Sequence, residues 1–284
     1  MALQFLKLRF YKFAKLKFNA IFKGENMNFN CLIPELRVFD LEKSKQFYTQ
    51  ILGFEIAYSR SDFAMVVLNE CQIMLQQLTL PSVKGSWNVT DDMTYPLGRG
   101  INFQIILPDI SKVYFSLKKH NVKIFADLMV SDYQENDTSN HVLEFLVQDP
   151  DGYLLRFQQD IEDWHFGNDK KTADKLFDSV LNGKKSATSY LFSKGAKLGT
   201  GFSVLTNWNK TKRMIVLTTK TYLTTFNEVT AEHAKKEGEG KGSLSSWREI
   251  HKNFFSQELE KQNLEFNESI KIVCEEFEVV KVYA

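Results

Sequence analysis

The stretch "FLVQDPDGYLLRF" (145–157) decides how the first half of this chain folds. Apolar residues on both sides of Asp-Pro-Asp-Gly are typical of strands, and the tetrapeptide itself is typical of a tight turn. The strand after the turn holds Arg156 at a position that should face a half-buried core. A guanidinium there needs an acidic partner, such as Glu144 or Glu35, or a bound ligand.

Outward from this turn, the chain reads as one unit of a strand, a helix and three strands. The helix is predicted over residues 109–121, with Asp109 as its N-terminal cap. The strands are predicted over residues 101–108, 122–130, 141–149 and 152–159.

The same order of elements occurs earlier in the chain. A helix is predicted over residues 40–52, capped by Asp40, because apolar residues recur along one side of it. Strands are predicted over residues 31–39, 53–61, 63–70 and 71–78. The sequence therefore predicts two βαβββ modules, joined by a loop over residues 80–100.

Length and composition exclude several classes of protein. The chain has 284 residues, 43% of them hydrophobic, and a formal net charge of +1, so two domains are expected, with no overall attraction to nucleic acid or membrane. Cys31, Cys71 and Cys274 form no Cys-x-x-Cys pair, which favours a reducing, cytoplasmic setting. No apolar run is long enough to span a bilayer, so a soluble protein without a membrane partner is expected.

Residues 1–28 form a basic extension. Six Lys and Arg side chains precede the first acid, Glu25, and aromatic residues lie between them. Such a segment suits an amphipathic helix at a membrane surface or on nucleic acid. A second hypothesis is a translated leader, because the codons for residues 23–25 can form a purine-rich ribosome-binding site ahead of a start at Met27.

The second half of the chain reads as a different domain, over residues 162–284. A helix over residues 170–181 ends at the pair Asn182-Gly183, which is typical of a helix C-terminus. Strands are predicted over residues 201–208, 213–226 and 269–284, with a charged helical segment over residues 230–259. A small β-barrel with flanking helices accounts for this order of elements.

Two motifs of the first half carry a resemblance. "IPELRVFDLEKSKQFYTQILGFEI" (33–56) and "FLVQDPDGYLLRF" resemble the vicinal-oxygen-chelate superfamily, specifically its bleomycin-resistance and glyoxalase-like proteins, over residues 29–161. The resemblance implies an α+β fold in which the paired modules form a curved mixed-sheet cup. In metal-dependent members, four strands each point a ligand into this cup. The corresponding positions here are Ile33, Met74, Asn102 and Arg156.

None of these four side chains suits a divalent metal, because the thioether is soft, the amide is a poor donor and the guanidinium stays protonated. The sequence therefore predicts no metal and no cofactor. The resemblance implies a small-molecule ligand in the cup instead, bound by Arg156, Asn102 and Met74 with Trp87 and Tyr95 as aromatic walls. Each aromatic residue is also compatible with a core position. The resemblance further implies a homodimer that completes the cup.

Four motifs of the second half carry another resemblance, to the ASCH family of PUA-like barrels associated with RNA and modified nucleosides. They are "GKKSAT" (183–188), "LGTGFSVL" (198–205), "FNEVTAEHAKKEGEG" (226–240) and "SLSSWREIHKNFF" (243–255). Some small members are amidohydrolases that remove the acetyl group from cytidine acylated on its exocyclic nitrogen. The resemblance implies Lys185, Thr188 and Glu237 as catalytic residues here.

Amide hydrolysis needs a nucleophile, a base and a proton donor. Thr188 would attack, Lys185 would take its proton, and Glu237 would protonate the leaving cytosine or stabilise the tetrahedral intermediate. The lysine needs a pKa roughly three units below its reference value to act as a base. Alternatively, Lys185 complements a helix C-terminus and Thr188 is an ordinary strand residue. Trp247, Arg248 and His251 lie at helical spacings in a longer segment than the small amidohydrolases have, and are candidates to cover the pocket and select a different substrate.

Two hypotheses follow. In one, the protein is a hydrolase acting on an acylated nucleoside or a similar small amide, and the N-terminal cup binds a related or regulatory ligand. In the other, both domains only bind: a metal-free cup sequesters an antibiotic, and the barrel contacts RNA. A metal-dependent glyoxalase or dioxygenase is excluded by the missing ligands.

Overall fold

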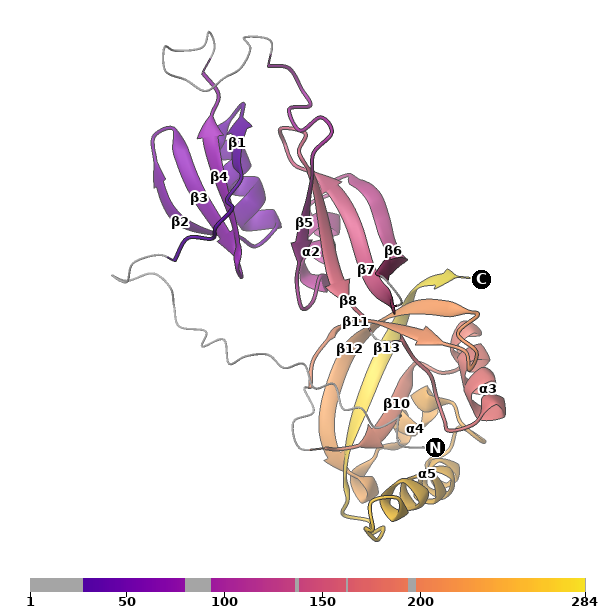
Figure 1. The fold of residues 1–284 in the computed structure, drawn as a ribbon. Coiled ribbons are helices and arrows are strands. Elements are labelled where there is room, and N and C mark those ends of the chain that lie inside the picture. Colours follow the sequence, from indigo (N-terminus) through magenta and orange to yellow (C-terminus); the bar gives the residue numbers. More distant parts are fainter. Residues whose placement is uncertain (1–27, 80–92, 136–137, 162, 194–197, 284) are drawn as a thin grey trace. The chain divides into compact units, whose positions relative to one another are not determined.

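A computed structural model describes residues 28–79, 93–135, 138–161, 163–193 and 198–283. Its chain divides into two compact units between Asp160 and Ile161, and each is treated by itself below. Figure 1 shows the elements of both units. The basic extension over residues 1–27 and the loop over residues 80–92 lie outside the described residues. Within the described part, no helix is long and apolar enough to cross a membrane.

The first module of the N-terminal unit is a four-stranded sheet with one helix. Strand order is β1-β4-β3-β2, with β1 parallel to β4. Asp40 caps the helix by accepting the Lys43 N–H. The elements are β1 (Glu35–Val38), α1 (Leu41–Gln46), the π-helical turn η1 (Phe47–Ile51), β2 (Glu55–Arg60), β3 (Phe63–Leu68) and β4 (Cys71–Gln77).

The second module repeats this plan in the order β5-β8-β7-β6, again with the first strand parallel to the last. Its elements are β5 (Asn102–Ile106), α2 (Ser111–Lys119), β6 (Ile124–Glu135), β7 (Thr138–Gln148) and β8 (Leu154–Asp160). The prediction that Asp109 is the N-cap is wrong. Ile110 occupies that position, and the Asp109 carboxylate instead accepts the Ser111 N–H, two residues along.

The Asp-Pro-Asp-Gly turn connects the two modules. Asp149 Oδ1 accepts the N–H groups of Asp151 and Tyr153, and its Oδ2 accepts the Tyr48 hydroxyl at 2.9 Å. Asp151 Oδ2 accepts the Ser44 hydroxyl at 2.7 Å. Both carboxylates are buried, so the turn that starts β8 also holds the helical segment of the first module.

The C-terminal unit is a curved five-stranded sheet of order β10-β13-β12-β11-β9, with three helices. Bulges in the long β12–β13 ladder help the sheet to curl into part of a barrel. The elements are β9 (Asp163–Trp164), α3 (Lys170–Leu181), β10 (Ala187–Leu191), β11 (Gly201–Thr206), β12 (Arg213–Thr225), η2 (Phe226–Glu228), α4 (Ala231–Glu237), α5 (Leu244–Glu260) and β13 (Lys271–Tyr283). The sequence predicted neither β9 nor β10.

Two apolar clusters make the core of this unit. α3 contributes Leu176, Phe177 and Val180 to one cluster, where they pack with residues of β11, β12 and β13. α4 and α5 contribute Ala234, Trp247 and Phe255 to the other. The helices therefore pack against separate parts of the curved sheet.

Candidate functional site

Lys185 and Glu237 are brought together by two helix ends. Past the end of α3, Gly183 has φ +68°, and the N–H groups of Lys184 and Lys185 both return to the Ser179 carbonyl. Glu237 is the last residue of α4, which the left-handed Gly238 terminates. The Lys185 ammonium donates to Glu237 Oε2 at 3.1 Å and to Glu239 Oε1 at 2.7 Å.

The Glu237 carboxylate is the centre of a buried polar cluster. Its Oε1 accepts the Ser189 hydroxyl at 2.7 Å, the Trp247 indole N–H at 2.7 Å and His233 Nε2 at 3.1 Å. Its Oε2 lies 3.1 Å from the Lys185 ammonium and 3.4 Å from His251 Nε2. Burial raises the pKa of this carboxyl, but Lys185 and the two histidines outweigh burial and hold the pKa well below its usual range.

The two histidines of the cluster are oriented by their other neighbours. The His251 ring stacks on Trp247 with centroids 4.2 Å apart, and its Nδ1 donates to the Trp247 carbonyl at 3.0 Å. His233 Nε2 lies 2.9 Å from Ser189 Oγ. Burial lowers the pKa of His233, but the neighbouring Cys274 and Glu237 outweigh burial and raise the pKa to about 9. His233 is therefore protonated at neutral pH.

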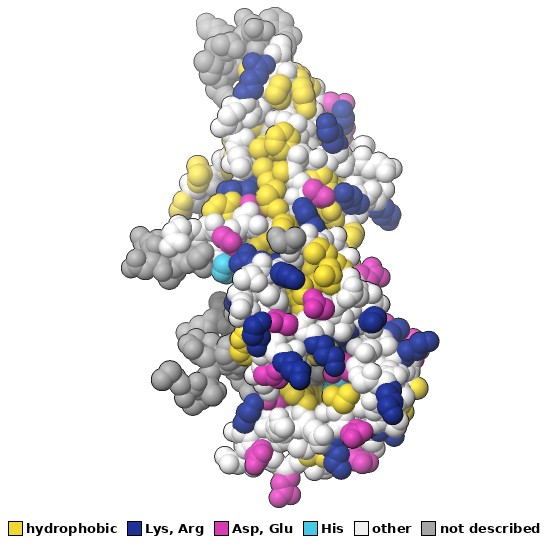
Figure 2. Space-filling view, turned by 90° about the vertical axis from the view of Figure 1, so that its right-hand side faces the viewer, with side chains coloured by type: hydrophobic (Ala, Val, Ile, Leu, Met, Phe, Trp, Pro, Cys, Tyr) yellow, Lys and Arg dark blue, Asp and Glu magenta, His cyan; other side chains and the backbone are white. Residues whose placement is uncertain are grey.

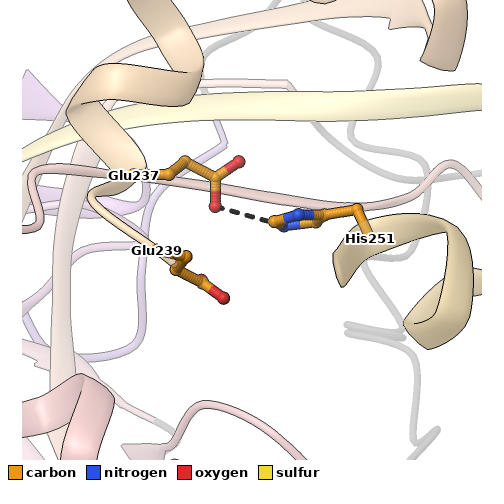
Figure 3. A group of neighbouring side chains, drawn as sticks. All are labelled: Glu237, Glu239 and His251. Atoms are coloured by element: carbon orange, nitrogen blue, oxygen red, sulfur yellow. Dashed lines mark ion pairs between the residues drawn. The ribbon is translucent and has the colours of Figure 1, made fainter. Parts of the chain in front are cut away.

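Glu237, Glu239 and His251 also form a group whose ligand atoms lie within 4.8 Å of one another, a spacing that could hold a metal ion. Figure 3 shows Glu237 and His251 pointing toward each other, with Glu239 on the loop that follows α4. However, the Lys185 ammonium contacts both carboxylates. The lysine supplies the positive charge that a metal would bring, so these contacts favour an ion-pair network over a metal centre.

Of the predicted catalytic residues, the structure brings Lys185 and Glu237 together but not Thr188. In β10, Ala187 and Ser189 are buried and Thr188 is half-buried, as expected for alternate residues that face opposite sides of a strand. Ser189 is thus the hydroxyl that contacts Glu237.

Trp247 and Arg248 have different surroundings from those expected for residues that cover a pocket. Trp247 is fully buried and positions the Glu237 carboxylate. Arg248 is exposed, and its Nη2 donates to the Asn227 carbonyl at 3.0 Å.

Sequence reasoning missed Ser189, His233 and Glu239 as members of this cluster. A signal for His233 exists in "HAKKE", because residues four apart lie on the same face of a helix. A signal for Ser189 exists in its even spacing from Lys185 through Ala187. Glu239 carries no such signal, since "EGEGKG" by composition reads as a loop.

In the N-terminal unit, Arg156 has an acidic partner. Its Nη1 lies 3.9 Å from Glu144 Oε2 and donates to the Tyr133 hydroxyl at 3.1 Å, while its Nη2 donates to Gln104 Oε1 at 2.5 Å. Of the two acids considered from the sequence, Glu144 is the one that Arg156 contacts.

The other predicted cup residues do not join this contact network. Asn102 is exposed and pairs with Leu154, so Gln104 takes the place opposite Arg156. Met74 is half-buried on β4, where it pairs with Glu35, and Ile33 is half-buried ahead of β1. Tyr95 is 56% exposed. Trp87 lies outside the described residues.

Comparison with known families identifies both domains. Residues 162–281 match the model of the ASCH domain, and residues 31–69 match the model described as bleomycin resistance protein-like N-terminal. No curated protein matches the chain.

Three solved structures illustrate these likenesses. An ASCH domain from Lactobacillus crispatus is 34% identical, with 42% of this chain and 78% of that chain covered and a TM-score of 0.40. A glyoxalase/bleomycin resistance protein/dioxygenase superfamily member from Vibrio splendidus is 34% identical, with 45% and 95% covered and a TM-score of 0.21. Its counterpart from Alicyclobacillus acidocaldarius is 17% identical, with 47% and 92% covered and a TM-score of 0.35.

The two family matches fall on separate units, in the order in which their motifs occur along the sequence. The chain therefore joins an N-terminal bleomycin-resistance-like domain, of the vicinal-oxygen-chelate type, to a C-terminal ASCH domain.

Proposed function

We propose that the ASCH domain hydrolyses an amide on a modified nucleoside of the acetylcytidine class, at the cluster around Lys185 and Glu237. One observation carries the proposal. Two residues that the family resemblance names as catalytic, 52 positions apart in sequence, form a buried ion pair beside the Ser189 hydroxyl. A cluster of charged groups this deeply buried is typical of functional sites.

The contacts support roles that differ from those expected at first. Lys185 donates in both of its ion pairs, so it suits stabilisation of the oxyanion that forms when the acetyl carbonyl is attacked. Glu237 is too acidic to protonate a leaving group, and instead orients Lys185 and Ser189. His233, protonated at neutral pH and 2.9 Å from Ser189 Oγ, is the acid of the cluster.

In the proposed reaction, a hydroxyl attacks the acetyl carbon and the bond from that carbon to the cytosine nitrogen breaks. The nitrogen leaves as the free amine after taking a proton from His233, and the hydroxyl proton restores His233. Water then hydrolyses the acyl ester, releasing acetate and regenerating the hydroxyl. Ser189 is the nucleophile that the contacts favour, and Thr188 is the one that the family motif favours.

Substrate reaches the cluster at Glu239. The side chains of Lys185 and Glu237 are fully buried, whereas that of Glu239 is 16% exposed. Glu239 therefore has to leave the Lys185 ammonium before a carbonyl oxygen can approach it.

The test is a chromatographic assay of acetylcytidine hydrolysis by the full chain. Lys185→Met and Glu237→Gln should reduce turnover by at least about a hundredfold, the usual cost of losing a group that stabilises the transition state. Ser189→Ala beside Thr188→Ala identifies the nucleophile. Lys184→Ala is the matched control, because Lys184 is exposed next to Lys185. Absence of turnover by the folded wild-type chain would overturn the proposal.

The alternative is a protein that only binds, with RNA on the ASCH domain and an antibiotic in the cup. On the face that Figure 2 shows, Lys and Arg side chains are interspersed with Asp and Glu, which gives little support to a basic RNA surface there. Salt-sensitive RNA binding without hydrolysis would favour this alternative. In either case, we propose that the N-terminal cup binds a small molecule.

We also assign the protein to the cytoplasm. Cys31, Cys71 and Cys274 are all free thiols, and Cys31 is exposed. Exposed free thiols suit a reducing compartment. Fractionation of native cells tests the assignment.

A further inference from the structure

We propose that the face of the second-module sheet that carries Arg156 binds an uncharged ligand through an amide-type edge, in which a carbonyl oxygen lies next to an N–H donor. This deepens the small-molecule role proposed above for the cup, by naming the chemistry that the cup recognises. It does not depend on hydrolysis by the ASCH domain.

The strand register places the polar residues of this site on one face. Arg156 on β8 pairs with Gln104 on β5, and the next residue on the same face of β8, Gln158, pairs with Glu144 on β7. Directly paired residues point to the same side of a sheet. Gln104, Arg156 and Glu144 therefore face one way, and Ile106 of β5, which is 60% exposed, shares that face.

A hydrogen-bond network fixes these side chains. Glu144 Oε1 accepts the hydroxyls of Ser131 and Tyr133, at 2.7 and 2.8 Å. Arg156 donates to Tyr133 and Gln104, and Gln104 in turn donates to Gln158 at 2.8 Å. Because each side chain is held by a neighbour, the site is ordered before a ligand arrives.

Among the residues that the structure describes, two buried atoms of this network find no hydrogen-bond partner: Glu144 Oε2 and Arg156 Nε. The Glu144 side chain is only 4% exposed. A buried polar atom without a partner costs free energy, so each of these atoms calls for a complementary group. Glu144 Oε2 needs an N–H or O–H donor, and Arg156 Nε–H needs an acceptor. An amide edge offers one of each.

The charges of the site select against ions. Glu144 Oε2 lies 3.9 Å from Arg156 Nη1, so the carboxylate and the guanidinium largely neutralise each other. A carboxylate ligand would be repelled by Glu144, and an ammonium or amidinium ligand would be repelled by Arg156. A neutral amide attached to an apolar ring avoids both repulsions, and its ring can contact Ile106 and the 41% exposed Tyr133.

Three probes of the same shape test this inference: benzamide, benzoate and benzamidinium. Benzamide presents a hydrogen-bond donor and an acceptor, benzoate presents only acceptors, and benzamidinium presents only donors. Titrations of the full chain, followed by amide chemical-shift changes in β5–β8, should show benzamide binding at least about tenfold more tightly than either ion.

Two variants locate the binding. Glu144→Gln replaces the free acceptor with a donor, and should weaken benzamide binding at least about tenfold. Arg156→Gln should weaken benzamide binding by a similar factor, and it provides the test if Glu144→Gln does not fold. Lys112→Ala, an exposed change on α2, is the matched control and should leave binding unchanged.

Equal binding of the three probes, or no binding of any of them, would overturn the inference. In that second case the two free atoms would be satisfied by water. A thermal-shift screen of unrelated compounds then separates the two proposals. Stabilisation by some other molecule, lost in Arg156→Gln, would keep the cup as a binding site while rejecting the amide edge.

Discussion

Glu237 contacts five side chains in the part of the chain that the structure describes, so substitutions around it act through one shared carboxylate. A carboxylate has about four lone-pair positions for donors, and here they are essentially filled. When one donor is lost, the negative charge stays buried and has fewer hydrogen bonds to stabilise it. The cost of each loss should therefore exceed that of an ordinary surface hydrogen bond.

Trp247→Phe tests this at one donor. Phenylalanine keeps a ring to stack on His251 and loses the N–H given to Glu237, so the C-terminal unit should lose about 1–3 kcal/mol of stability. Urea denaturation of the full chain measures the change. Trp208→Phe, at a half-buried position outside the cluster, is the control and should cost under about 1 kcal/mol. Equal costs would mean that the indole N–H does not stabilise the carboxylate.

His233 predicts a pH dependence. Its pKa is raised from 6.5 to about 9 in the folded protein, so the folded state binds this proton more tightly than the unfolded state does. Its stabilising contribution is fully present below about pH 6.5 and is lost as the pH rises through about 9. The difference in unfolding free energy between wild type and His233→Gln should thus be larger at about pH 6 than at about pH 9.5. A difference independent of pH would contradict the shift.

At the scale of elements, the two helix ends that carry Lys185 and Glu237 depend on glycine to different degrees. Gly183 and Gly238 both have left-handed backbones, with φ near +68° and +64°. A Cβ at Gly183 would meet no atom of the described residues within 4 Å, whereas one at Gly238 would lie 2.1 Å from the Lys184 carbonyl oxygen. Gly238 is therefore required both for its conformation and for the close approach of two chain segments.

This pair provides a matched experiment. Gly183→Ala should cost about 1 kcal/mol, the price of a left-handed alanine. Gly238→Ala should cost clearly more and should also reduce hydrolysis, because Lys184 would have to move and Lys185 follows it. Thermal denaturation and the acetylcytidine assay measure both effects. Similar costs for the two variants would show that the backbone yields without strain at Gly238.

At the scale of the whole molecule, the two modules of the N-terminal unit share a buried acidic turn. Burial, with a smaller contribution from Asp151, raises the pKa of Asp149 from 3.8 to about 7, although its hydrogen bonds with Tyr153 and Tyr48 oppose the shift. Burial likewise raises the pKa of Asp151. The connection between the modules therefore contains a carboxyl that is costly to ionise.

Asp149→Asn should expose this cost. A group with a raised folded pKa stabilises fully below about pH 3.8, and that contribution is lost as the pH rises through about 7. Wild type should therefore lose up to a few kcal/mol between about pH 5 and about pH 8, while the asparagine variant loses less. Urea denaturation at both pH values measures this. Asp62→Asn, at an exposed carboxylate, is the control and should behave as wild type.

Much of the architecture followed from local pattern. The repeated order of strand, helix and three strands was confirmed, since alternation, helical spacing and turn residues act over a few neighbouring positions. β10 was missed because "ATSYL" is short and partly polar, and becomes a strand through its pairing with β13. The N-cap of α2 was misplaced by one residue, because an aspartate can also accept the N–H group two residues along in a turn, as Asp109 does from Ser111.

The sequence by itself determined two domains, their order and a family for each, because these reside in motifs that are contiguous along the chain. Only the tertiary structure decided which groups meet. It placed the Lys185 ammonium against Glu237 and Glu239, and it pointed Ser189 rather than Thr188 toward Glu237. It also paired Arg156 with Glu144. The physical reason is that such contacts form between residues far apart in sequence, and depend on strand register and on how distant segments pack together. A shift of one residue along a strand points a different side chain into the site.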